Sequence, residues 1–207
     1  MRKYGYKEGK GLGKREDGIT EPIQGNRKVT FCNDQPSKDS WPKNTVLFAG
    51  DSMYNNIDEK RIGRNVKRNV KVRAHPGATT QDMQHHLTAL LRKQPSHLVL
   101  HVGANDASND DKRAEDIVNE ILELKHFAES LVSGIKVAIS CPITRTDNHK
   151  ANVKVIHIRA LLRTSGINDI IVNDNIGVDM LGKKGLHLSN KGVGNLARNM
   201  IEYLKSL

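Results

Sequence analysis

From position 45 onward, short apolar runs alternate along the chain with stretches of helical periodicity. The apolar runs are rich in Val, Ile and Leu and are bounded by turn residues, which is typical of strands buried inside a sheet. They predict five strands, at 45–49, 70–74, 97–102, 135–140 and 170–173.

Between these runs, the spacing of apolar residues changes to the three- and four-residue repeat of a helix. The clearest repeat is followed by Gly134 as a stop and consists of Ile117, Ile121, Leu124, Ala128 and Leu131. Helices are also expected at 80–93, at 151–164 and after a Ser189 cap. Because strand and helix alternate five times, we expect a doubly wound three-layer α/β/α fold with a five-stranded parallel sheet in the flavodoxin-like order 2-1-3-4-5.

The first 44 residues have a different texture from the rest of the chain. Residues 1–25 are rich in glycine and charge, and residues 26–44 are polar, with Pro36 and Pro42. We interpret 26–44 as a linker and 45–207 as one folded domain.

Composition narrows the class of protein. Aromatic residues make up only 4% of the 207 residues, so the core must be largely aliphatic. No apolar run approaches the roughly 18 to 20 residues that span a bilayer, and the first residues lack the apolar stretch of a secretory signal. Cys32 and Cys141 are the only cysteines. We therefore expect no membrane span and an intracellular protein, nuclear or cytoplasmic.

The formal net charge is +10, and basic residues concentrate in one stretch. Seven Lys or Arg and no acid lie between Lys60 and Arg73. Such a stretch suits nucleic-acid phosphates or another anionic surface, and equally a solvated helix end beside a strand edge. No aromatic residue interleaves with these charges, which disfavours a single-strand binder that stacks bases.

Polar residues follow the ends of the expected strands. Ser52 follows the first strand, Gly77 the second and Asn105 the third, and His187 lies in the loop before the last helix. Taken singly, each residue also has an ordinary structural explanation. Ser52 is typical of a helix cap, Asn105 is typical of a turn, and His187 is only one of nine histidines. Because parallel strands end at one edge of a sheet, the order 2-1-3 places Ser52 between Gly77 and Asn105. Together they supply a nucleophile, a base and hydrogen-bond donors.

Four segments resemble the sequence blocks of the SGNH (GDSL) hydrolase superfamily, in its order and spacing: FAGDSM, HPGATT, HVGAND and GLHLSNKG. The resemblance spans about residues 44–206, and short forms are similar to esterase domains of some non-LTR retrotransposon proteins. It implies a serine esterase for small acyl esters, with Ser52 and His187 as the catalytic pair and no cofactor or metal. It also implies an oxyanion hole of Ser52, Gly77 and Asn105, where glycine keeps a side chain out of the substrate's path.

One position departs from the superfamily pattern. An aspartate three residues before the histidine orients the ring in that pattern, and this chain has Lys184 there. A backbone carbonyl, Asp179 or Asp174 takes over that role, or activity is impaired. If the missing carboxylate limits the rate, Lys184→Asp is expected to raise turnover.

The segment from Tyr4 to Ile23 resembles a G-patch, with spaced glycines, GLG and a terminal EPI. It lacks the spacing of a nucleotide-binding glycine loop. The resemblance implies RNA or a DEAH-box helicase as partner, engaged through residues 1–25 and the basic stretch 60–73. Two hypotheses follow: an esterase, or a catalytically weak domain that acts in RNA or helicase interaction.

Overall fold

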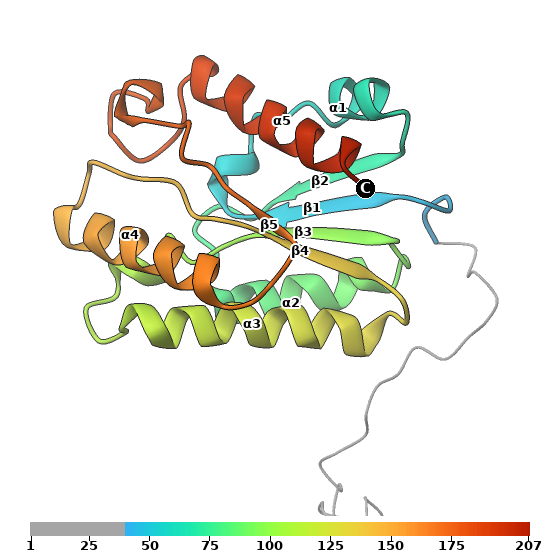
Figure 1. Ribbon diagram of the computed structural model, residues 1–207, viewed down its shortest axis with the longest axis horizontal. Helices are drawn as coiled ribbons and strands as arrows, with labels where there is room; N and C mark the ends of the chain where they lie inside the picture. Colours follow the sequence, from blue (N-terminus) through green and yellow to red (C-terminus); the bar gives the residue numbers. More distant parts are fainter. Residues whose placement is uncertain (1–39) are drawn as a thin grey trace, which may run out of the picture.

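The computed structural model describes residues 40–207, which form a three-layered α/β/α domain (Figure 1). The five strands are all parallel and lie in the order β2-β1-β3-β4-β5, which confirms the order expected from the sequence. The strands are β1 (Val46–Gly50), β2 (Val70–Ala74), β3 (His97–His101), β4 (Lys136–Ser140) and β5 (Ile170–Ile171). The G-patch-like segment 1–25, Cys32 and most of the expected linker lie outside the described residues.

Two groups of helices cover the two faces of the sheet. The α-helices are α1 (Glu59–Val66), α2 (Thr80–Leu91), α3 (Ala114–Leu131), α4 (His149–Thr164) and α5 (Asn190–Lys205). Three short 3-10 turns are η1 (Ser52–Tyr54), η2 (Asp106–Ser108) and η3 (Val178–Met180). Helices α1 and α5 lie side by side on one face, and α2, α3 and α4 cover the other (Figure 1).

The central strand β1 shows why the sequence folds in this way. All five of its residues are buried, as expected of a parallel strand covered on both faces. Successive side chains point to opposite faces. Leu47 and Ala49 therefore join the core beneath α2, α3 and α4, while Val46 and Phe48 join the core beneath α1 and α5.

Two elements differ from the sequence prediction. Strand β5 is two residues long, Ile170–Ile171, where a longer strand over 170–173 was expected. Helix α1 was not predicted as an element of its own, because Ile62 is its only buried residue and half of its eight residues are charged. The Asp58 carboxylate starts α1 by accepting hydrogen bonds from the backbone N–H groups of Lys60 and Arg61, at 2.9 and 3.1 Å.

The end of the expected linker is docked on the domain. Trp41 donates its backbone N–H to the Lys93 carbonyl at 2.9 Å, and its ring packs against the core beneath α2. Arg73 and Lys93 lie over this ring, 5.9 and 5.6 Å from its centroid. The division of the chain at 25 and 44 stays a prediction. Within residues 40–207, no helix has the length and apolar character needed to cross a membrane.

Candidate active site

Ser52 is presented by a tight turn at the carboxyl end of β1. The Asp51 side chain accepts a hydrogen bond from the Met53 N–H at 2.9 Å and so starts η1 at Ser52. The turn requires glycine at position 50, because a Cβ there would lie 2.7 Å from the His101 carbonyl oxygen and 2.9 Å from the Tyr54 ring. Close packing at Gly50 thus fixes where the Ser52 hydroxyl emerges from the sheet.

His187 lies on a loop between η3 and α5 that is closed on itself. Leu181 and Leu188 form an antiparallel bridge, and the Gly182 N–H donates to the His187 carbonyl at 2.6 Å. The tip of the loop rests on the segment before α4, where the Thr146 N–H donates to the Gly185 carbonyl at 2.7 Å. Gly185 has a φ of +67°, which favours glycine. The loop therefore holds His187 at a fixed place.

The structure brings Ser52 and His187 together. The Ser52 Oγ atom lies 3.2 Å from His187 Nδ1, at the outer limit of a hydrogen bond and within the range of a ligand-free catalytic pair. Both residues line a pocket of about 190 Å³ at the carboxyl ends of the strands. Ser52 is half-buried and His187 exposed, so a substrate can reach both.

Gly77 and Asn105 come from the two strands that flank β1. Gly50 of β1 is in register with Ala74 of β2 and with His101 of β3, so all three following loops start at one level of the sheet. Asn105 Nδ2 donates to the Ala78 carbonyl at 2.9 Å and ties two of these loops together. The second hydrogen of that amide is left for another acceptor.

The backbone N–H groups of Ser52 and Gly77 are also available as donors. Among residues 40–207 neither has a hydrogen-bond acceptor. No protein atom lies within 4 Å of where a Cβ on Gly77 would stand, so the space there is open, and the expected clearance for a substrate stays a prediction. Gly77 also has a φ of +79°, a conformation that by itself favours glycine.

A buried carboxylate that the sequence analysis did not single out holds these loops in place. Asp106 is 1% exposed and accepts hydrogen bonds from the Thr80 N–H at 3.0 Å, the Thr80 hydroxyl at 2.8 Å and Lys112 Nζ at 3.0 Å. Burial opposes the charge on Lys112, but Glu120 and Asp106 raise its pKa above the ordinary value. Asp106 thus fixes Asn105 against the start of α2, next to Gly77.

A second buried group lies under η1. The Asn173 amide donates to Ser140 Oγ at 3.0 Å, and Ser140 Oγ lies 3.0 Å from His101 Nδ1. Burial lowers the pKa of His101 and raises that of Tyr54, whose ring lies 5.2 Å from the His101 ring. Both side chains stay neutral and serve as packing beneath Ser52.

The structure does not bring either expected orienting aspartate to the histidine ring. Asp174 forms ion pairs with Arg159 and Arg163 on α4. Asp179 accepts from Lys191 Nζ at 2.7 Å, and this ammonium lowers the pKa of Asp179. Within the part of the chain that the structure describes, Ser52 is the only side chain hydrogen-bonded to the His187 ring.

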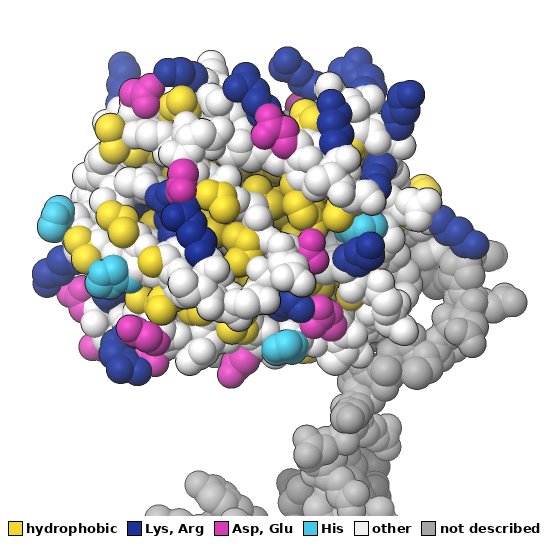
Figure 2. Space-filling view, viewed as in Figure 1, with side chains coloured by type: hydrophobic (Ala, Val, Ile, Leu, Met, Phe, Trp, Pro, Cys, Tyr) yellow, Lys and Arg dark blue, Asp and Glu magenta, His cyan; other side chains and the backbone are white. Residues whose placement is uncertain are grey.

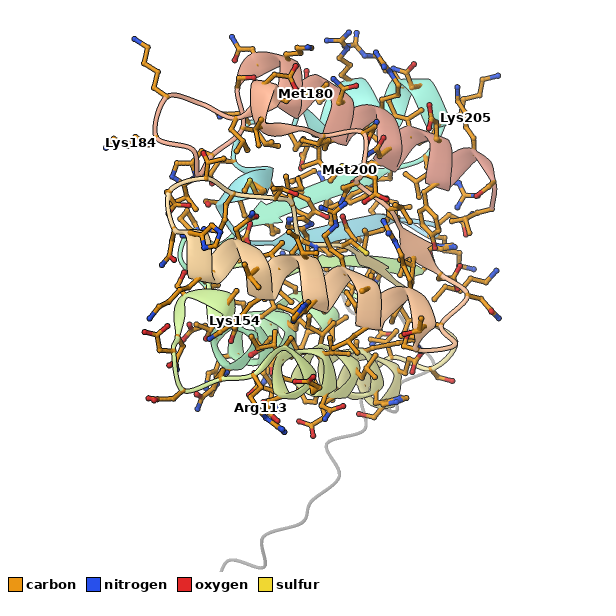
Figure 3. The ribbon with its side chains drawn as sticks, turned by 60° about the vertical axis from the view of Figure 1, so that its left-hand side comes forward. Arg113, Lys154, Met180, Lys184, Met200 and Lys205 are labelled. Carbon is orange, nitrogen blue, oxygen red and sulfur yellow. The ribbon has the colours of Figure 1, made fainter. Side chains whose placement is uncertain are left out.

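Lys184 does not approach the catalytic pair either. It is exposed and lies at the outer tip of the loop, away from the sheet (Figure 3). Because Nδ1 of His187 faces Ser52, the nitrogen that a carboxylate at position 184 was expected to hold is already engaged. The hydrogen bond to Nδ1 that Lys184→Asp was expected to restore is therefore not available while Nδ1 faces Ser52.

Comparison with solved structures identifies the fold of residues 40–207. A GDSL-like lipase from Bacteroides thetaiotaomicron matches with a TM-score of 0.62 at 14% identity, over 79% of this chain and 88% of that one. A lipolytic protein of the G-D-S-L family from Desulfitobacterium hafniense gives 0.66 at 17%, over 77% and 99%. A family 3 carbohydrate esterase from Talaromyces cellulolyticus gives 0.61 at 14%, over 79% and 99%. The domain has the SGNH hydrolase fold, as the sequence resemblance implied.

The other comparisons concern the sequence itself. The family model of the G-patch domain matches residues 1–29, which confirms the resemblance seen in the glycine pattern. None of the curated proteins matches this chain. The chain therefore combines a G-patch with an SGNH-type fold.

Proposed function

We propose that this domain is a serine hydrolase of small acyl esters, with Ser52 as nucleophile and His187 as general base. The observation that carries the proposal is the 3.2 Å approach of Ser52 Oγ to His187 Nδ1 at the rim of an accessible pocket. A hydroxyl is a weak nucleophile unless a neighbouring base takes its proton, and imidazole is well suited to that role. The proposal is supported by the position of Ser52 after β1, at the edge of the sheet where parallel α/β folds bind ligands.

The reaction proceeds in two halves. As Ser52 Oγ bonds to the acyl carbon, its proton moves to His187 Nδ1, and the carbonyl oxygen becomes an oxyanion. The N–H groups of Ser52 and Gly77 and the free amide hydrogen of Asn105 supply three donors for that oxyanion. The tetrahedral intermediate then expels the alcohol, which takes the proton from His187. Water repeats the sequence on the acyl-serine and releases the carboxylic acid.

Among residues 40–207, no carboxylate is hydrogen-bonded to the His187 ring, and we expect this to lower the rate. In trypsin-like enzymes, replacing the orienting aspartate by its amide lowers kcat about 10⁴-fold. In this chain, the Ser52 hydroxyl and the closed loop around His187 orient the ring instead. We therefore expect acylation of Ser52 to occur, with slow turnover.

A fluorophosphonate probe tests the proposal directly, because it reacts covalently with an activated serine. We expect labelling of the full-length wild-type chain and none of Ser52→Ala. The matched control is Ser130→Ala, which removes an exposed hydroxyl on α3 and should leave labelling unchanged. A folded wild-type protein that resists the probe would contradict the proposal.

A second candidate function is favoured by the G-patch match at residues 1–29. It is interaction with RNA or a DEAH-box helicase through this segment, with the SGNH-fold domain as a catalytically weak partner. The same probe separates the two functions. An unlabelled wild-type chain that stimulates the ATPase of such a helicase, and loses this effect when residues 1–29 are deleted, would favour interaction over catalysis.

A further inference from the structure

Helices α1 and α5 together carry a line of cations on the outer face of the domain. Lys191, Arg198 and Lys205 recur every seven residues on α5, which places them on one side of that helix. Over these 14 residues the line is about 21 Å long at 1.5 Å per residue. Dark blue side chains accordingly gather over α5 and α1 at the upper edge of Figure 2. Helix α1 adds Lys60, Arg61 and Arg64.

Within the part of the chain that the structure describes, most of these charges have no counter-ion. Among residues 40–207, Lys191 pairs with Asp179, but Arg61, Arg64 and Arg198 form no ion pair. The other end of the basic stretch 60–73 behaves differently. Lys71 and Arg73 on the edge strand β2 both pair with Glu59. The part of the stretch left to attract an anion is therefore 60–68, which is α1 and the two residues after it.

The space between α1 and α5 is a groove of about 610 Å³. Its polar lining has one ammonium, two guanidinium groups, four amides and one carboxylate, from Lys191, Arg61, Arg198, Asn56, Asn65, Asn190, Asn195 and Asp58. The Asp58 carboxylate is engaged by the backbone N–H groups of Lys60 and Arg61 at the start of α1. Guanidinium and amide N–H groups are the side-chain donors that proteins use on phosphate oxygens. No aromatic side chain lines the groove, so bases have nothing to stack on.

We propose that the α1–α5 groove binds the phosphate backbone of single-stranded nucleic acid, without regard to sequence. A cationic line about 21 Å long suits an extended polyanion better than one isolated anion. A concave groove between two helices accepts one strand, whereas a duplex or a membrane would rest on the rim. Asn65 and Asn195 each donate one amide hydrogen to a backbone carbonyl of their own helix, Arg61 O at 2.8 Å and Lys191 O at 3.0 Å, and the second hydrogen of each amide is left for a phosphate oxygen. This site is separate from the G-patch and does not depend on Ser52 being catalytic.

The groove also adjoins the candidate active site. Asn56 and Val193 line both the groove and the pocket that holds Ser52 and His187. A strand in the groove therefore passes the mouth of the pocket. Where Ser52 reacts with a fluorophosphonate, bound nucleic acid should slow that reaction.

Fluorescence anisotropy of a labelled single-stranded RNA of about 12 nucleotides tests the site on the full-length chain. The variant is Arg61→Gln with Arg198→Gln. The control is Lys136→Gln with Lys150→Gln, which changes the net charge equally but lies at the start of β4 and on the α4 face. We expect the first pair to weaken binding and to flatten the salt dependence of log K by about 1.4, from two lost phosphate contacts. The control pair should match wild type.

Four results would overturn the proposal. If both pairs of substitutions weaken RNA binding equally, the effect is due to net charge alone. If the Arg61/Arg198 variant binds RNA as tightly as wild type, the RNA binds at the G-patch and not in the groove. A duplex of the same sequence, or vesicles containing phosphatidylserine, that bind more tightly through Arg61 and Arg198 would assign the groove to another partner. Circular dichroism checks that both variants fold.

Discussion

Two glycines in the same helix should respond in opposite ways to the same substitution. Gly192 and Gly194 both lie in α5, directly after the loop that carries His187. A Cβ on Gly194 would meet nothing within 4 Å. A Cβ on Gly192 would overlap the Met180 carbonyl oxygen and would lie 2.9 Å from Leu188 Cδ2. The difference in stability between Gly192→Ala and Gly194→Ala therefore separates the effect of packing from that of helix propensity.

The expected magnitudes follow from these surroundings. Alanine in place of an unconstrained helical glycine stabilises by about 1 kcal/mol, so Gly194→Ala should raise Tm by about 2–4 °C. At Gly192 the same gain is opposed by overpacking, which costs about 1–3 kcal/mol. The Met180 carbonyl cannot shift freely, since it accepts from Ser189 N and Ser189 Oγ, each at 2.9 Å. Disturbing those two bonds adds about 1 kcal/mol each, so we expect a net loss of about 2–4 kcal/mol and a Tm lower by about 4–16 °C.

Thermal unfolding followed by circular dichroism measures both variants, and the rate of fluorophosphonate labelling of Ser52 measures the effect on the site. Gly192→Ala should also slow labelling, because Met180 and Ser189 anchor the loop that holds His187. Gly194→Ala should label at the wild-type rate. Equal Tm values for the two variants, or a Gly192→Ala protein more stable than wild type, would refute the packing argument.

Two further predictions concern charge. Lys184→Asp should leave kcat for a short-chain aryl ester unchanged, because His187 Nδ1 faces Ser52; a clear gain would show that the ring uses its other nitrogen. Burial raises the pKa of Glu59, but the Val72 N–H, Lys71 and Arg73 outweigh it and lower that pKa overall. Wild type should therefore be more stable than Glu59→Gln above the unfolded pKa of about 4.3, and urea unfolding should show this advantage vanish as pH falls through the lowered folded pKa. A difference that is constant with pH would contradict the ion pairing.

Hydrophobic pattern was enough to predict β1, β3 and β4 because burial on both faces leaves a strong signal, whereas the edge strand β2 buries only Val70. Each of the four longer strands is five residues long. Because strands alternate with helices along the chain, the strands are expected to be parallel. Helix α1 was not predicted because it buries only one residue, so its sequence is rich in charge and has little hydrophobic periodicity. Elements that contribute little apolar surface to a core are specified by caps and by tertiary contacts, here the Asp58 cap and the packing against α5.

The candidate site divides along the same line. Ser52 could be named from sequence because it follows β1, whose end is marked by Gly50. His187 could be named because it precedes the Ser189 cap of α5 within a segment that resembles an SGNH block. Which ring nitrogen of His187 faces Ser52 could not be predicted from the sequence. It depends on the geometry of the loop, which is set by contacts between residues distant in sequence, such as the hydrogen bond from Thr146 N–H to the Gly185 carbonyl. Asp106 also left no pattern, since one buried carboxylate beside Asn105 looks like any turn residue until its three donors are in place. The same dependence on three-dimensional context explains the groove: Arg61 and Arg198 lie 137 positions apart in the sequence, and only the packing of α1 against α5 makes them one surface.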